Sequence, residues 1–98
     1  MNAITGIATS GLRAASTGLQ TAAHNLANLA TPDATRQTVA LSADAAGVSA
    51  RVVEAPADPA APIEDVAAML AYKAMAGANL FVLKVAGQTL GSLLDIRA

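Results

Sequence analysis

The chain contains no cysteine, which excludes both a disulfide framework and a thiolate metal site. Aromatic residues make up only 2% of its 98 residues, although 54% of them are hydrophobic and many of those are alanine. Because alanine buries little area, we expect helices that approach each other closely rather than a thick core. A single domain of this size is only marginally stable alone, which favours oligomerisation.

Charged residues are also scarce, at 13%, and the net charge is −1. Binding to phosphate backbones needs clustered Lys and Arg, so we predict no nucleic-acid partner. The first residues lack the basic and apolar regions of a cleavable signal peptide. Lys84, glycines and polar residues interrupt the longest apolar stretches, and we therefore predict that no segment spans a bilayer.

A long amphipathic helix is predicted over about residues 3–30. One row of residues seven apart consists of Leu12, Leu19 and Leu26, and a second consists of Ala8, Ala15, Ala22 and Leu29. Together the rows form an a/d seam that favours close helix approach. Three glycines each weaken the helix by up to about 1 kcal/mol, so a partner surface must stabilise it. Pro32 restricts Thr31 to extended geometry and predicts the end of the helix near Ala30.

The middle of the chain predicts a different structure. Residues 35–54 carry β-branched residues in rough alternation around a possible turn at 44–47, which is typical of a short β-hairpin. An isolated hairpin is marginal in water, so it must pack on the helices or stay mobile. Residues 55–62 contain three prolines and predict an extended linker.

A second helix is predicted over about residues 63–96, directly after Pro62. Its heptad rows are Met69, Ala76, Leu83 and Leu90, and Tyr72, Asn79, Ala86 and Leu93. This helix is apolar over more of its circumference than one partner helix can cover, which indicates self-association. The predicted fold is therefore mainly α and a single domain, 1–98. Two long antiparallel helices form a coiled-coil-like helical hairpin, joined by the β-hairpin and the Pro-rich linker.

No enzyme constellation is present in the sequence. His24 is the sole histidine and has no carboxylate at helical spacing, so it predicts no metal cluster. The serines lack a nucleophile elbow, and Gly6 and Gly11 lack the lysine of a phosphate-binding loop. We predict no catalytic, metal or cofactor site.

Two asparagines three residues apart, Asn25 and Asn28, precede the Thr-Pro stop and have two interpretations. Amides near the end of a helix commonly satisfy its free carbonyl groups. Alternatively, an amide in an apolar seam fixes the register between subunits. The heptads likewise predict either an ordinary antiparallel helix pair or an oligomerising module.

The sequence Asn-Leu-Ala-Asn-Leu-Ala-Thr-Pro at 25–32 resembles the signature of the bacterial flagellar rod and hook family of axial proteins. The preceding run at 11–19 looks like the N-terminal helix of that family. At the other end, Ala78-Asn79, Val82-Leu83 and the Leu-Leu-Asp-Ile-Arg tail at 93–97 are similar to its C-terminal helix. The matches bracket the chain and cover roughly two thirds of it. Asp33 and Ala34 replace the Gly and aromatic residue of the signature, so the resemblance is to a divergent, short member.

The resemblance implies a structural subunit of the flagellar basal body rod. In this family the terminal helices pair to form the inner tube of the axial structure. Its partners would be further copies of itself, other flagellar axial proteins and the flagellar type III export apparatus. It would lie in the periplasmic rod and be exported without a cleaved signal peptide. The alternative is a small helical adaptor or chaperone-like module that binds a partner's amphipathic helix. The residues predicted to carry helix pairing and assembly are Leu12, Leu19, Asn25, Leu26, Asn28, Thr31, Met69, Asn79, Leu83, Leu90, Leu93 and Leu94.

Overall fold

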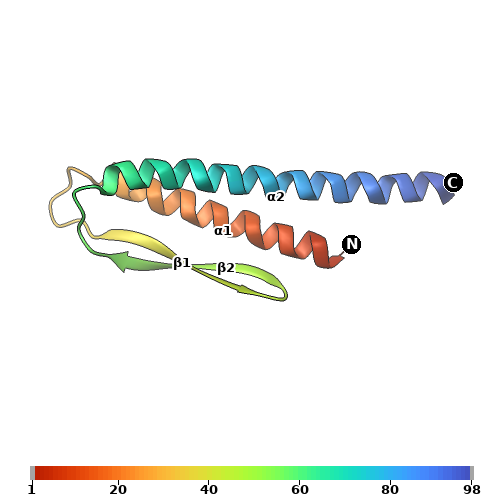
Figure 1. Ribbon diagram of the computed structural model, residues 1–98, viewed down its shortest axis with the longest axis horizontal. Helices are drawn as coiled ribbons and strands as arrows, with labels where there is room; N and C mark the ends of the chain where they lie inside the picture. The colour runs from red at the N-terminus through yellow and green to blue at the C-terminus, as the bar shows by residue number, and fades with distance from the viewer. Residues whose placement is uncertain (1, 98) are drawn as a thin grey trace.

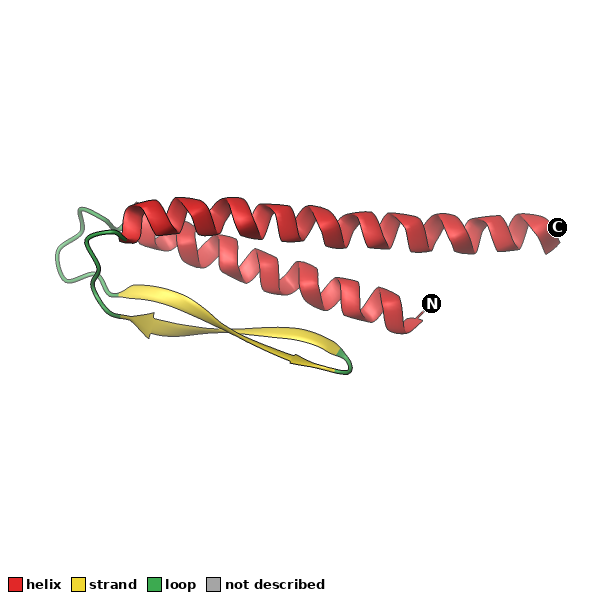
Figure 2. Cartoon of the chain, in the orientation of Figure 1, coloured by secondary structure: helices red, strands yellow, loops and turns green. Residues whose placement is uncertain are grey.

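The computed structural model describes residues 2–97. Its elements are α1 (Asn2–Ala27), β1 (Arg36–Asp44), β2 (Gly47–Ala55) and α2 (Ala61–Arg97), as Figure 2 shows. The chain is thus mainly helical, as predicted, with two helices and one two-stranded antiparallel sheet. The two strands separate the helices along the chain, so the finer prediction of a helical hairpin is not established by this architecture.

The three parts lie in layers within an elongated molecule of 62 × 22 × 16 Å. α1 is the middle layer: it packs against α2 on one side and against both strands on the other (Figure 1). The helices run in opposite directions, and the described part of α2 packs against α1 but not along the strands. One long face of α2 is consequently left without a covering element.

The helix boundaries follow from local hydrogen bonds. α1 ends at Ala27, three residues before the predicted end, because residues 28–30 form a turn in which the Asn28 N–H bonds to the carbonyls of His24 and Asn25. α2 begins at Ala61, and Pro62 lies in its first turn. Proline is tolerated there because the N–H groups of the first turn have no partner within the helix. Asp58 precedes this helix, and its Oδ1 accepts a hydrogen bond from the Ala60 N–H at 2.9 Å.

The β-hairpin pairs Arg36 with Ala55 at one end and Asp44 with Gly47 at the other. Gly47 has a φ of 132°, which a side chain would strain, and a Cβ there would also collide with the hydroxyl of Ser10. Ser10 Oγ accepts a hydrogen bond from the Val48 N–H at 3.0 Å. This contact fixes the tip of the β-hairpin to α1, so of the two alternatives predicted for the hairpin, packing or mobility, the structure shows packing.

The core of the described residues is thin. Its buried hydrophobic residues are all alanines: Ala8, Ala14, Ala15, Ala22 and Ala61. The chain exposes 6655 Å², whereas a compact monomer of its 9.7 kDa mass would expose about 5,100 Å². The layers therefore leave about 1,500 Å² more surface in water than a typical protein of this size.

Within the described residues, α2 is the one helix that is long and apolar enough, by length and composition, to cross a bilayer. Its most apolar window within Ala61–Asp95 has a mean hydropathy of 1.6 and is not buried. The expectation that interruptions such as Lys84 would disqualify every segment is therefore wrong at the level of composition. The physical reason is that the surrounding Leu, Val, Phe and Ala residues outweigh one or two lysines in the average. Long helices of soluble proteins pass the same test, so the absence of a spanning segment stays a prediction.

Candidate functional site

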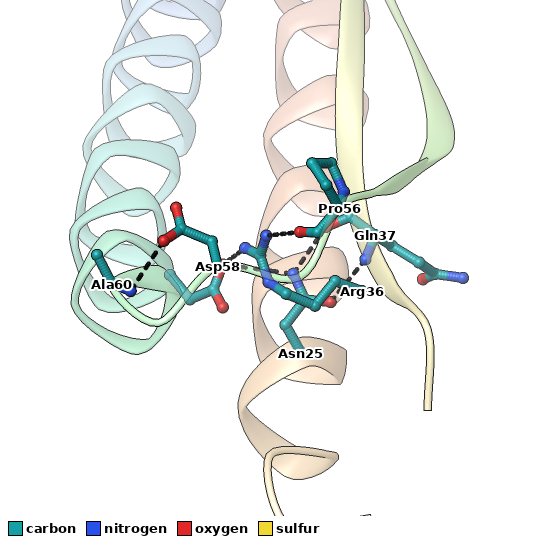
Figure 3. A network of polar contacts seen from close by, with 7 residues as sticks. Asn25, Arg36, Gln37, Pro56, Asp58 and Ala60 are labelled. Carbon is teal, nitrogen blue, oxygen red and sulfur yellow. Dashed lines mark hydrogen bonds and ion pairs between the residues drawn. The ribbon is translucent and has the colours of Figure 1, made fainter. Parts of the chain in front are cut away.

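Asn25 is the centre of a buried polar junction near the end of α1 (Figure 3). It is 5% exposed, and its side-chain amide pairs with the backbone of Gln37 in β1. Nδ2 donates to the Gln37 carbonyl at 2.7 Å, and Oδ1 accepts from the Gln37 N–H at 2.9 Å. Nδ2 also lies 3.3 Å from Oδ1 of Asp65 in α2. One amide therefore joins α1, β1 and α2.

A salt bridge completes the junction. Arg36 Nη2 donates to Asp65 Oδ1 at 3.1 Å, and Nη1 donates to the Pro56 carbonyl at 3.2 Å. Asp65 is 5% exposed, so its charge depends on these partners for compensation. The junction fixes the open end of the β-hairpin and the second turn of α2 to α1, and so sets the register in which the helices pair.

Beyond the junction, the close contacts between α1 and α2 recur every seven residues along each helix. Gly18 faces Tyr72, and a Cβ at Gly18 would lie 2.5 Å from Cδ1 of the ring. One heptad further, a Cβ at Gly11 would lie 2.7 Å from Asn79 Cγ. These distances are far below ordinary contact, so glycine is what permits the two helices to approach. At the next step Ile4 and Ala86 line one hollow.

The predicted leucine seam is only partly what the helices bury. Leu12, Leu19 and Leu26 are half-buried, whereas Ala8, Ala15, Ala22 and the glycines at Gly11 and Gly18 are buried. Leu29, the last residue of the predicted alanine row, lies in the turn after α1 and is 57% exposed. The leucines are therefore at the flank of the contact and the small residues are at its centre. On α2, Met69, Asn79 and Leu83 are half-buried. The leucines of α1 lie at the flank because two helix backbones in contact through glycine and alanine are too close for a leucine side chain to fit between them.

The two predicted asparagines have different roles. Asn28 Nδ2 donates to the His24 carbonyl at 2.8 Å, which confirms for this residue that its amide satisfies a helix carbonyl. Asn25 instead fixes register, but within one chain. Thr31 is exposed in the turn after α1, where its N–H bonds to the Asn28 carbonyl at 3.1 Å. His24 is exposed, and its ring lies 3.4 Å from the Asn28 amide.

α2 extends well beyond the start of α1, as Figure 1 shows. From Ala86, the last residue of α2 facing α1 in these steps, the helix continues for about 11 residues, or roughly 16 Å. Leu90, Leu93 and Leu94 lie on this overhang, and each is at least 49% exposed. The structure does not bring these three predicted residues together with the other assembly residues. The side chains of Ile96 and Arg97, in the family-like tail, lie outside the described part of the chain.

The second uncovered region is the free face of α2, opposite the residues that meet α1. We define the free face as positions spaced alternately by three and four residues, namely Ile63, Val66, Leu70, Lys73, Gly77, Leu80, Lys84, Gly87, Gly91 and Leu94. Ile63 is 78% exposed, Leu70 64% and Leu94 60%. Phe81 lies beside this face and is 66% exposed. Two lysines and three glycines interrupt this row, and its exposed apolar residues leave a long strip of α2 uncovered.

The described residues offer little for chemistry. They contain no group of three His, Asp or Glu side chains close enough to hold a metal ion. The most apolar hollow, of about 360 Å³, is open and lies where α1 begins; its lining is Ile4, Phe81, Val82, Val85, Ala86 and Thr89. Its only side-chain polar group is one threonine hydroxyl, so it lacks the convergent polar groups that orient a substrate.

Sequence reasoning did not identify the partners in the junction or the glycine contacts. The sequence predicts Asp65 only as part of the second helix, and Arg36 and Gln37 only as parts of the β-hairpin. A usable signal did exist in the equal spacing of Gly11 and Gly18 with Tyr72 and Asn79. Matching glycines to large residues at the same interval predicts an antiparallel close approach.

Comparison of this chain with models of known protein families and with curated proteins finds no match.

Proposed function

We propose that this chain is a non-enzymatic structural subunit that self-assembles through its long helices, as an axial protein of the bacterial flagellar basal body rod or a close paralogue. The observation that carries the proposal is α2, which projects beyond α1 and has an uncovered apolar face. A surface excess of about 1,500 Å² in a chain without a large buried side chain among its described residues is typical of a subunit rather than a finished monomer. The two-ended sequence resemblance supplies the choice of assembly.

In this proposal the antiparallel α1–α2 pair, a coiled-coil-like helical hairpin, is the unit of assembly. The junction around Asn25 holds the β-hairpin against α1 and fixes how far α2 extends beyond α1. The overhang, with Leu90, Leu93 and Leu94, then contacts a neighbouring subunit or another axial protein of the periplasmic rod. The chain would reach that site through the flagellar type III export apparatus without a cleaved signal peptide.

We further propose that α2 does not span a membrane. Lys73 and Lys84 lie on either side of the middle of the helix Ala61–Arg97. A lysine at the centre of a bilayer costs about 2.5–3.5 kcal/mol on insertion scales. Protein contacts along the same face let both lysine side chains extend to water, because their apolar stems pack while the charges stay hydrated.

The test is deletion of the gene in the source bacterium, followed by complementation. Deletion should impair basal-body assembly and motility. A gene carrying Leu93→Asp should fail to restore them, because a carboxylate would enter the apolar overhang contact. Ser92→Asp, which adds the same charge at the adjacent exposed residue, should restore them. Normal flagella and motility in the deletion strain would refute the proposal.

The apolar hollow at Ile4 favours a second candidate, a helical adaptor that binds the amphipathic helix of a partner. An adaptor should stay monomeric as its concentration rises, whereas an assembly subunit should associate. Light scattering over a concentration range separates the two candidates. A strictly monomeric chain in that experiment would favour the adaptor.

A further inference from the structure

The free face of α2 contains three glycines that no contact within the chain explains. A Cβ built at Gly77, Gly87 or Gly91 meets no other atom within 4 Å. This is the opposite of Gly11 and Gly18, where a Cβ would collide with side chains of α2. Glycine lowers helix propensity, so its use inside a helix needs a reason such as a close approach. On the free face, that approach must come from outside the described chain.

The large side chains of the free face are distributed unevenly along it. Ile63, Val66 and Leu70 occupy the first part of the helix, and two of the three glycines, Gly87 and Gly91, occupy the last part. The centre holds Gly77 and Leu80 side by side on the face. The face therefore has projections at one end and notches at the other, which makes it complementary to its own reversed copy.

We propose that a second copy of this chain docks on the free face of α2 in antiparallel orientation about a two-fold axis. The pairing places Leu80 on Gly77 of the second copy, Leu70 on its Gly87, Val66 on its Gly91 and Ile63 on its Leu94. Each large apolar residue except the terminal pair thus meets a glycine. The two-fold axis repeats every contact, as expected of an isologous interface.

Other arrangements of the same helices fit less well. Parallel pairing places each glycine opposite the same glycine, which leaves gaps at three layers, and sets each lysine against its own copy. Shifting the antiparallel pair by one heptad shortens the overlap. One such shift sets Gly77 against Gly87, and the other leaves Leu94 uncovered.

The area of the face is sufficient for a weak dimer. From Ile63 to Leu94 the helix rises about 46 Å, and a strip about 10–12 Å wide covers on the order of 500 Å² in each copy. The total of about 1,000 Å² is at the lower limit for a specific interface. The excess surface of the chain is large enough to supply it. We therefore expect association with a Kd on the order of micromolar.

One layer of the proposed interface is unfavourable and provides the test. Lys73 faces Lys84 of the second copy, and the two-fold axis creates this contact twice. Changing either lysine to glutamate converts both like-charge contacts to opposite-charge contacts. Changing both lysines restores like-charge contacts, now between carboxylates. The pattern of response is specific to this register.

The experiment measures the dimer Kd of the full chain by sedimentation equilibrium. Lys73→Glu and Lys84→Glu should each tighten the dimer about tenfold, because two pairs change from repulsion to attraction. The double variant should return to a Kd near that of the parent. Arg51→Glu, at an exposed position of β2, makes the same change in net charge away from the interface and should leave the Kd unchanged.

Several results would overturn the proposal. A parallel dimer predicts no tightening by either single variant, since each would then face its own copy. A chain that is monomeric at every concentration, or that floats with neutral phosphatidylcholine vesicles as a monomer, has no such interface. The proposal uses the same uncovered helix as the proposed rod function but different residues from the Leu93 test. If the Kd measurements contradict the dimer, the Leu93→Asp complementation still tests the rod function. If complementation contradicts the rod function, the Kd measurements still test the dimer.

Discussion

Replacing Asn25 with alanine removes three hydrogen bonds from the junction that joins the layers of this protein. Two of them bind the Gln37 backbone at 2.7 and 2.9 Å, and the third reaches Asp65 at 3.3 Å. A hydrogen bond contributes about 1 kcal/mol net, so we expect a loss of about 3 kcal/mol of unfolding free energy. Domains of this size have about 5–15 kcal/mol in total. The substitution should therefore remove a substantial fraction of the stability.

Asn28→Ala is the matched control, because it deletes the same amide three residues away. Its bond to the His24 carbonyl lies within the end of α1 and is exposed, so its loss should cost no more than about 0.5–1 kcal/mol. Urea unfolding followed by circular dichroism, at a protein concentration too low for association, measures both variants. With a slope of about 1–3 kcal/mol per molar urea, the Asn25→Ala midpoint should fall by about 1 M or more. Equal midpoints for the two variants would show that Asn25 does not join the layers.

Two further substitutions test the helix contact and the salt bridge. Gly18→Ala should lower the unfolding free energy by about 1–3 kcal/mol, since its methyl group would collide with the facing tyrosine ring, while Gly6→Ala, in open space on the same helix, should raise it slightly. If both glycine variants raised the thermal midpoint by similar amounts, the close approach of α1 to the tyrosine ring would be refuted. Arg36→Ala should cost about 3 kcal/mol because it leaves Asp65 buried without its cation. Arg51→Ala, on the exposed side of β2, should change the urea midpoint little, and parity between the two arginine variants would refute the role of the salt bridge.

Local sequence signals predicted the elements well because their causes are local. Pro32 lies in the loop that follows α1, and Pro62 lies in the first turn of α2, where its missing N–H is tolerated. The hairpin followed from β-branched residues on either side of a short turn. Even the three-residue error at the end of α1 has a local cause, the turn at residues 28–30 in which the Asn28 N–H bonds to the carbonyls of His24 and Asn25.

The packing was less predictable because its causes are distant in the chain. Asn25 bonds to a residue 12 positions away and to another 40 positions away. Two rows of α1, one of leucines and one of small residues, have the same spacing of seven. Periodicity alone cannot say which row is at the centre of a contact. The position of the hairpin on α1 decides it, since the hairpin occupies one side and leaves the other for α2.

The glycines offer a way to separate contacts within the chain from contacts between chains. Each costs a helix up to about 1 kcal/mol relative to alanine, so the three on the free face of α2 cost up to about 3 kcal/mol together. In α1, close packing against Tyr72 and Asn79 offsets that cost at Gly18 and Gly11. No neighbour within the described residues offsets it on the free face. These three glycines on an apolar, uncovered face support our proposal that the face is half of an interface, with its other half on a second copy of the chain.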